Sequence, residues 1–369
     1  MGTVNTAINI LGTRGIPAGH GGFETFAEEY SLHLVGRGVT VRVYCPSERR
    51  EDVEWRGVSL IKIKAPDTAI GSMLFDLKAT VHAARHGGLN LVLGYNTAVI
   101  NLLLNIVRRP YFINMDGIEW QRRKWGRLAK LWFRLNERVA SAAATGLIAD
   151  HPAIAAHLEP ITRRKIVISM IPYGSRESSN GKSAVGRESL VERWGLNGAY
   201  ALIIARPEPE NSIEEMVAAW SQKPRGANLV VLGRYTEENP YTKRVLDVAS
   251  DEVRFIGPVY EKSTLDILRE CAAFYMYGHT VGGTSPTLVE ALGCGSPILA
   301  LDSVYSRWVA GSSAEYFATQ EECASQIERL LQDEDLRKRL SGEARARHSE
   351  EFVWSKIFRS YDNALGLDA

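Results

Sequence analysis

Five glycines lie between the first predicted strand and the first predicted helix. They fall within Gly12–Gly22, directly after the apolar run Ala7–Leu11. Glycine permits positive φ and close backbone approach, so successive N–H groups and the following helix N-terminus can face an anion. The spacing supports neither a dinucleotide fingerprint nor a P-loop. Because open α/β sheets bind ligands at the carboxyl ends of their strands, we favour a phosphate-binding loop over a merely flexible one, with Arg14 as a candidate phosphate clamp.

A second candidate anion site lies in the second half of the chain. Arg206 directly follows one predicted strand, and His279 follows the strand Ala273–Met276. The turn Gly282-Gly283-Thr284-Ser285 then opens a predicted helix, and its amides can hold a diphosphate. Glu290 lies about one and a half turns into that helix, where its carboxylate can accept hydrogen bonds from ribose hydroxyls.

Two carboxylates follow the predicted strand Tyr111–Asn114. Asp116 and Glu119 lie in the segment Asp116-Gly117-Ile118-Glu119-Trp120. At a strand end such groups can orient an acceptor hydroxyl or stabilise a developing sugar cation. For Asp116 the alternative is capping of the next helix.

The segment that follows is basic and aromatic. A helix is predicted over Gln121–Val139, with Trp120, Trp125 and other aromatic residues interleaved among basic ones. The basic residues are Arg122, Arg123, Lys124, Arg127, Lys130, Arg134 and Arg138. This pattern fits a helix lying in an anionic membrane interface over residues 120–138, and the alternative is an amphipathic helix packing its tryptophans into the core. Nucleic-acid binding is disfavoured, because the chain holds 44 basic and 43 acidic residues and shows no nucleic-acid motif.

No metal or cofactor is predicted. His82 and His86 have helical spacing, but no acidic residue lies between them as in a zinc-protease helix. The triplet Asp333-Glu334-Asp335 lies in a charged helical segment rather than at a strand end. The four cysteines are far apart and form no CxxC pair, which favours reduced thiols.

Short apolar runs alternate with amphipathic segments, which predicts an α/β fold of two doubly wound sheets. In the first half the strands are expected at Ala7–Leu11, Val39–Cys45, Val58–Ile63, Leu89–Leu93, Tyr111–Asn114, Gly146–Ala149 and Ile166–Ile168. In the second half they are expected at Ala199–Ala205, Leu229–Leu232, Val253–Ile256, Ala273–Met276 and Pro297–Ala300. The polar segment Ser175–Gly186 is typical of a linker. We expect an N-terminal domain at 1–172, a C-terminal domain at 173–350, and a helix at 351–369 that packs back on the first domain.

The N-terminal region lacks a basic segment and a long apolar core, so export is not expected. No stretch reaches the roughly 18 to 20 uncharged apolar residues of a membrane span. We expect a cytoplasmic protein, with peripheral attachment to the inner face of the plasma membrane as a further hypothesis.

The chain resembles the retaining GT-B glycosyltransferases of family 4 over nearly its whole length. Arg206 matches the Arg of the family's G-R-x-x-x-x-K signature, and Glu290 matches the second Glu of its E-x7-E motif. Val253-x-Phe255-x-Gly257 resembles the strand end beside the nucleotide base. The chain departs from the family at two positions, where Asn211 replaces the usual Lys and Gly282 replaces the first Glu.

Four segments resemble a rhamnosyltransferase-like subgroup of bacterial polysaccharide enzymes. They are T-R-G-I-P-A-x-x-G-G-F-E-T-F, D-G-x-E-W-x-R-x-K-W, R-x-E-P-E-N and G-G-T-x-P-x-L-x-E-A. The resemblance implies a dTDP-β-L-rhamnose donor or a related nucleotide sugar, a saccharide acceptor on a polyprenyl diphosphate lipid, and retention of configuration. A nucleotide-sugar 2-epimerase and a non-catalytic nucleotide-sugar binding protein are the alternatives.

The resemblance and the strand-end positions together define the expected site. Catalytic roles are expected for Asp116, Glu119 and Arg206. Acceptor contacts are expected from Arg14, Glu24 and Trp120. Donor contacts are expected from Gly21, Gly22, Arg206, Asn211, Phe255, Gly257, His279, Gly282, Gly283, Thr284, Ser285 and Glu290.

Overall fold

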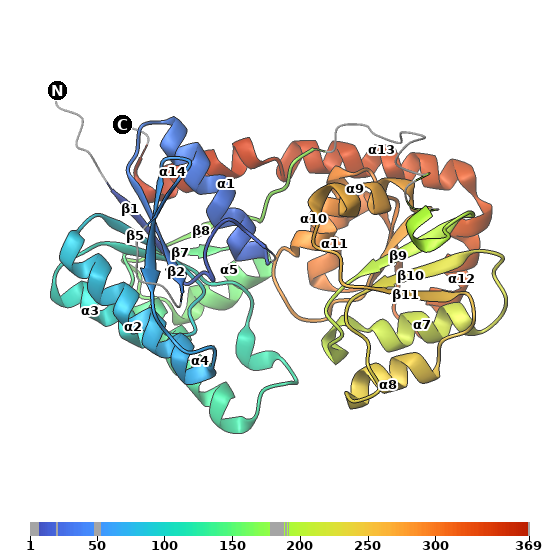
Figure 1. Ribbon diagram of the computed structural model, residues 1–369, viewed down its shortest axis with the longest axis horizontal. Coiled ribbons are helices and arrows are strands. Elements are labelled where there is room, and N and C mark those ends of the chain that lie inside the picture. The colour runs from blue at the N-terminus through green and yellow to red at the C-terminus, as the bar shows by residue number, and fades with distance from the viewer. Residues whose placement is uncertain are drawn as a thin grey trace. The chain divides into compact units, whose positions relative to one another are not determined.

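The computed structural model describes residues 7–19, 21–47, 53–177, 188, 190 and 192–367. The chain divides into two compact units, one formed by residues 1–173 together with 354–369 and the other by residues 174–353. Each unit is a Rossmann-like α/β layer structure around one sheet (Figure 1). The predicted fold class is therefore confirmed.

The first unit contains an eight-stranded sheet in the order β3-β4-β2-β1-β5-β6-β7-β8. Its strands are β1 (Ile8–Leu11), β2 (Val41–Pro46), β3 (Val53–Trp55), β4 (Val58–Ile63), β5 (Leu89–Leu93), β6 (Tyr111–Asn114), β7 (Gly146–Ala149) and β8 (Val167–Met170). Strand β3 pairs antiparallel with β4, and the other neighbours pair in parallel. The central strands are buried on both faces, which explains why they read as continuous apolar runs.

Helices cover both faces of this sheet. They are α1 (Gly22–Gly36), α2 (Ala69–His86), α3 (Ala98–Ile106), α4 (Arg127–Ala143), α5 (Pro152–Leu158) and α14 (Trp354–Leu365), with short 3-10 turns at η1 (Glu119–Gln121) and η2 (Glu159–Ile161). Helices α1 and α14 lie on one side of the sheet, and α2, α3 and α4 lie on the other (Figure 1).

Helix α14 joins the first unit through an apolar stripe. Trp354, Ile357, Phe358 and Tyr361 follow helical spacing and are buried in the same core as the β1 residues. Buried Asp362 accepts hydrogen bonds from Tyr30 (2.9 Å) and His33 (2.8 Å) of α1 and from Arg37 (2.5 Å), which directly follows this helix. Full burial of one large apolar side chain contributes about 1.5–3 kcal/mol, so the stripe alone is a substantial part of this docking.

The second unit contains a six-stranded parallel sheet in the order β11-β10-β9-β12-β13-β14. Its strands are β9 (Tyr200–Ile204), β10 (Asn228–Leu232), β11 (Val253–Gly257), β12 (Phe274–Tyr277), β13 (Ile298–Leu301) and β14 (Ala314–Phe317). Its helices are α7 (Ile213–Ser221), α8 (Pro240–Asp247), α9 (Lys262–Cys271), α10 (Pro286–Gly293), α11 (Val304–Ala310), α12 (Gln320–Gln332) and α13 (Glu334–Glu351), with 3-10 turns η3 (Pro209–Asn211) and η4 (Gly311–Ser313).

Some sequence predictions were wrong in detail. The predicted helix Gln121–Val139 begins only at Arg127, because η1 and a turn precede it. The last strand of the first sheet runs over Val167–Met170 rather than Ile166–Ile168, and β3 and β14 were not predicted. Most of the predicted linker Ser175–Gly186 lies outside the described residues.

The acidic triplet has a structural role. Asp333 caps α13, accepting a hydrogen bond from the backbone N–H of Leu336 at 2.8 Å. The histidines of α2 also pack as surface groups: their rings stack at 3.8 Å, and His82 contacts the Tyr44 hydroxyl. Within the described part of the chain, no group of three or more His, Cys, Asp and Glu side chains could hold a metal ion.

Candidate functional site

The loops after β9 and β12 flank the switch point of the second sheet. From β9 the chain winds outward to β10 and β11, then crosses to β12, β13 and β14 on the other side. Where the connections that follow two adjacent strands run in opposite directions along the sheet, a crevice lies at the carboxyl ends of those strands. Open α/β sheets bind ligands in this crevice. Arg206 and Asn211 belong to the first loop, and His279 and Gly282–Ser285 belong to the second. The fold thus places these predicted residues at one sheet edge.

The two loops are bonded to each other. Thr280 donates hydrogen bonds from its backbone N–H (2.9 Å) and its hydroxyl (3.0 Å) to the backbone carbonyl of Glu210. A Cβ at Gly278 would lie 2.5 Å from the Asn211 carbonyl oxygen, so only glycine allows this approach. The geometry of the Arg206 loop therefore depends on the β12 loop.

Asn211 occupies the position where family 4 glycosyltransferases usually have a lysine. Its side chain stabilises the conformation of the Arg206 loop from inside. Its side chain is buried and donates a hydrogen bond to the Arg206 carbonyl at 2.7 Å. The same carbonyl accepts from the Glu208 backbone N–H at 2.7 Å. The Arg206 guanidinium itself is 69% exposed and lies 3.8 Å from the Glu208 carboxylate. This loose contact leaves the guanidinium accessible to an anion.

The Gly282–Ser285 turn ends at the N-terminus of α10. The Ser285 hydroxyl contacts that of Thr287 at 3.2 Å and makes no capping bond to the described helix. Pro286 occupies the first helical turn, where its missing N–H costs nothing. Among the described residues, Ser285 makes no side-chain capping bond to the first-turn amides. These amides and the helix dipole can therefore attract an anion.

Glu290 projects from α10 and is paired with a fully buried cation. The Arg269 side chain, from α9, is 2% exposed and its Nη2 donates a hydrogen bond to Glu290 Oε2. Burial lowers the pKa of Arg269, but attraction to Glu290 and other nearby groups outweighs this and the net pKa rises. The Glu290 carboxylate is 29% exposed, so one side remains reachable by a ligand. No sequence pattern indicated Arg269, which lies 21 residues away in another helix.

The remaining predicted donor contacts lie near the same edge. Gly257 ends β11 with φ of 77°, and its carbonyl accepts a hydrogen bond from Gly233. Phe255 packs against Tyr235 with ring centroids 4.8 Å apart. His279 stacks on Tyr277 at 4.4 Å. The structure therefore positions His279 in the switch-point loop, whereas Phe255 also contributes to packing.

The glycine loop of the first unit occupies the equivalent position in its own sheet, at the switch between β1 and β5. Gly12 has φ of 79°, and a Cβ there would lie 2.3 Å from the Leu93 carbonyl oxygen of the neighbouring strand. Glu24, near the start of α1, accepts hydrogen bonds from the Arg14 backbone N–H (2.8 Å) and the Thr13 hydroxyl (3.2 Å). Glu24 thus fixes the conformation of the glycine loop around Thr13 and Arg14.

A cavity of about 300 Å³ adjoins this loop. Arg14, Glu24 and Lys62 contribute charged groups to its lining, together with Cys45 and Ser47. Gly15 and Gly19 of the glycine loop line the same cavity, so it brings the cations Arg14 and Lys62 beside these two glycines.

The two acidic residues after β6 have different environments. Asp116 has φ of 51°, in the left-handed region, and its backbone N–H donates to Asn114 Oδ1 at 2.9 Å. Glu119 is buried and accepts hydrogen bonds from Arg122 Nε (2.5 Å) and Trp125 Nε1 (3.1 Å). Glu119 organises the turn before α4. Its backbone N–H donates to the Tyr95 hydroxyl, which links this turn to the loop after β5.

Trp120 is held by α4 rather than presented to solvent. Its Nε1 donates to Glu137 at 3.2 Å, and the Arg134 guanidinium lies 4.3 Å from the centre of its ring. The acceptor contact predicted for Trp120 would involve a partly buried, restrained ring.

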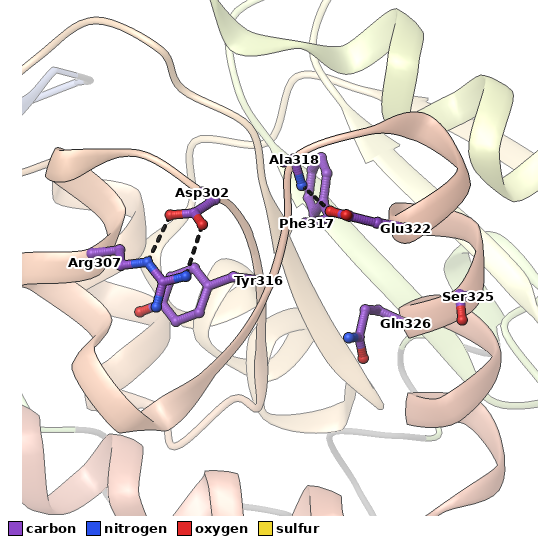
Figure 2. A pocket seen from close by; sticks show the side chains of 8 residues that line it. All are labelled: Asp302, Arg307, Tyr316, Phe317, Ala318, Glu322, Ser325 and Gln326. Atoms are coloured by element: carbon purple, nitrogen blue, oxygen red, sulfur yellow. Dashed lines mark hydrogen bonds and ion pairs between the residues drawn. The ribbon is translucent and has the colours of Figure 1, made fainter.

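A separate pocket of about 410 Å³ lies at the ends of β13 and β14 (Figure 2). Arg307 pairs with Asp302 at 2.6 Å and stacks over Tyr316 at 4.2 Å, while Glu322 accepts from the Ala318 backbone N–H. Arg307 and Asp302 therefore pair with each other, Glu322 is bonded to the backbone, and none of these residues belongs to the switch-point loops.

Two family models match the chain, one in each half. Residues 5–176 match a family model described as a domain of unknown function (DUF1972), and residues 188–347 match one described as glycosyl transferases group 1. None of the curated proteins compared with the chain matches it significantly.

Solved structures share the fold over nearly the whole chain. A sucrose-phosphate synthase from Thermosynechococcus elongatus superposes with a TM-score of 0.84 at 16% identity, covering 98% of each chain. The Anabaena protein HepE in complex with UDP gives 0.75 at 16% identity, covering 98% of this chain and 100% of that one. WaaG, a glycosyltransferase involved in lipopolysaccharide biosynthesis, gives 0.74 at 15% identity, covering 97% and 99%. The fold and the group 1 domain together support a GT-B glycosyltransferase.

Proposed function

We propose that this protein transfers a sugar from a nucleotide-sugar donor that binds at the β9/β12 switch point of the second unit. The carrying observation is the convergence of exposed Arg206, the Gly282–Ser285 turn and Glu290 at one sheet edge. A diphosphate fits the guanidinium and the helix N-terminus. The ribose fits the exposed side of Glu290. The UDP and UDP-glucose complexes of HepE give a precedent for such donors on this fold.

The chemistry requires stabilisation of a departing nucleoside diphosphate. Negative charge grows on its phosphate oxygen as the bond between that oxygen and the anomeric carbon of the sugar breaks. Preorganised cations and amides stabilise that charge. Arg206 and the α10 amides supply these groups, so we propose that transfer needs neither a metal ion nor a cofactor. We also propose retention: the acceptor hydroxyl oxygen bonds the anomeric carbon on the face from which the diphosphate leaves, and the leaving phosphate oxygen accepts the hydroxyl proton.

The donor sugar we propose is L-rhamnose, carried as dTDP-β-L-rhamnose, and the acceptor is a saccharide on a polyprenyl diphosphate lipid. The support is the resemblance of four sequence segments to the rhamnosyltransferase-like subgroup of family 4. The glycine loop and Arg14 of the first unit, with the adjoining cavity, are proposed to contact the acceptor, and Asp116 is proposed to orient its hydroxyl.

Thermal-shift screening against a nucleotide-sugar panel tests the donor assignment. We expect the largest rise in melting temperature with dTDP-rhamnose, a smaller rise with UDP and GDP sugars, and no loss of the effect on addition of EDTA. Stabilisation by none of the panel would contradict the proposal. Isomerisation of the donor without acceptor would instead indicate a 2-epimerase.

A further inference from the structure

Helices α2, α3 and α4 form one layer on a single face of the first sheet (Figure 1). The successive crossovers β4–β5, β5–β6 and β6–β7 advance in the same direction along the sheet. Because such crossovers are right-handed, their helices must lie on the same face. The N-termini of all three helices therefore lie at the carboxyl edge of the sheet.

Helix α2 turns a stripe of apolar side chains outward. Ile70, Met73, Leu74 and Leu77 have the spacing of one helix face and are exposed by 73%, 38%, 41% and 39%. The opposite stripe, which includes Phe75 and other residues, is buried against the sheet. The helix is thus apolar on both its inner and its outer side.

Helix α4 shows the same arrangement. Leu128, Leu131 and Leu135, at one-turn and two-turn spacing, are exposed by 85%, 65% and 48%. Leu102 and Ile106 of α3, between the two, are also exposed. The sequence pattern had directed attention to the tryptophans of this region, whereas the exposed apolar groups are mainly leucines.

Two hydrogen bonds set the register of the three helices. The Thr97 hydroxyl, at the start of α3, donates to Asp76 of α2 at 2.8 Å, and the Val99 backbone N–H donates to Asn136 of α4 at 2.9 Å. Asp76 and Asn136 are therefore level with the first turn of α3. The exposed stripes of α2 and α4 lie opposite the buried stripes of the same helices, so the exposed leucines lie on the outer face of this layer.

The charge on this layer has a single sign. Among the described residues, Arg123, Arg127, Lys130 and Arg138 make no ion pair. The acidic residues of these helices face inward, where Asp76 accepts from Thr97 and Glu137 accepts from Trp120. The chain as a whole is almost neutral at +1, so the basic excess is local.

We propose that the surface formed by α2, α3 and α4 docks on an anionic lipid bilayer. Exposed leucines bordered by basic side chains match the acyl region and the negative headgroups of such a surface. A second copy of the chain fits poorly, because a two-fold contact would bring these cations against each other. A nucleic acid would leave the leucines exposed. The inference rests on the proposed function in one respect: an enzyme with a lipid-linked acceptor must reach that acceptor at a membrane.

Vesicle flotation tests this surface with the intact protein. We expect it to float with phosphatidylcholine vesicles containing about 30% phosphatidylglycerol and to remain at the bottom with pure phosphatidylcholine. The pair Leu128→Ser and Leu131→Ser should reduce partitioning about tenfold or more, and the pair Arg127→Glu and Lys130→Glu should do the same. Leu128 and Leu131 are exposed, and Arg127 and Lys130 make no ion pair within the described part of the chain, so we expect both variants to fold.

Matched controls lie outside the surface. Val304→Ser removes an apolar side chain that is 60% exposed on α11, and the pair Arg164→Glu and Lys165→Glu reverses two exposed charges beyond α5. Both controls should float like the wild type. Equal recovery with neutral and anionic vesicles would overturn the proposal, as would full binding by the leucine variant. A concentration-dependent dimer that the leucine variant abolishes would assign the surface to a second copy instead.

Donor binding separates this inference from the proposed function. Thermal shift with nucleotide sugars reports on the second unit and needs no vesicle. Flotation without any donor response would leave the docking surface standing and remove the glycosyltransferase assignment. A donor response without flotation would support the glycosyltransferase assignment and overturn the docking surface.

Discussion

The carboxylate of Glu290 is held by the guanidinium of Arg269, a side chain that is 2% exposed. An arginine buried this deeply remains charged, and its hydrogen bond fixes one carboxylate oxygen while leaving the group partly open to solvent. The same arginine lies 3.4 Å from Asp266. Arg269 is thus a positioning residue for the proposed ribose contact.

Replacing Arg269 by Gln should weaken donor binding by about 10- to 100-fold, because the Glu290 carboxylate loses its charged partner. The expected signature is a raised KM for the donor with a smaller change in kcat, measured by steady-state kinetics. Arg269→Lys should recover part of the affinity. If the glutamine variant melts at a lower temperature but keeps its donor KM, the arginine is merely structural.

Arg206→Ala should raise the donor Kd about tenfold or more, because an exposed guanidinium available for a diphosphate is removed. Isothermal titration with the nucleoside diphosphate measures this directly. Lys243→Ala is a suitable control, since that lysine is 55% exposed on α8 and outside the switch-point loops. Unchanged diphosphate affinity in the Arg206 variant would remove this residue from the donor site.

Asn211→Lys introduces the residue usual in family 4 and should nevertheless destabilise the protein. Asn211 is 4% exposed and bonds the Arg206 carbonyl, so a lysine would bury a charge and break the bond. We expect a loss of about 2–4 kcal/mol in chemical denaturation. An unaltered midpoint together with higher donor affinity would show that the loop accommodates a cation here.

Asp116→Asn and Glu119→Gln should separate chemistry from architecture. Asparagine tolerates the left-handed backbone at position 116, so that variant should keep its fold while turnover falls by tenfold or more. Glu119→Gln weakens bonds to Arg122 and Trp125 and should lower stability by about 1–3 kcal/mol. Turnover and denaturation midpoints are the two measurements. Full turnover in the Asp116 variant would end its proposed role.

Asp76 should make the protein more stable toward mildly acidic pH. Burial raises the pKa of Asp76 from 3.8 to about 6, although the hydrogen bond from Thr97 opposes this rise. The folded state therefore binds the Asp76 proton more tightly than the unfolded state does. As the pH falls from about 6 to 4, this difference raises the free energy of unfolding by about 2–3 kcal/mol at most. Denaturation of the wild type and of Asp76→Asn at both pH values should show this slope only in the wild type.

The alternation of apolar and amphipathic segments was sufficient to predict two doubly wound sheets, because buried parallel strands must be continuously apolar. Arg206, the Gly282–Ser285 turn and the first glycine loop were predictable for a related reason. A residue at the carboxyl end of a strand beside the switch point lies at the ligand edge wherever the strand sits in the sequence.

The partners of these residues were decided by the tertiary structure. Arg269 meets Glu290 only because α9 and α10 flank β12, and Thr280 meets Glu210 only because β9 and β12 are neighbours. The apolar stripe of α2 reads as core in the sequence, since spacing alone does not say which of two apolar helix faces meets the sheet. Local spacing is a property of a segment, whereas pairing and exposure depend on what other segments bring alongside it.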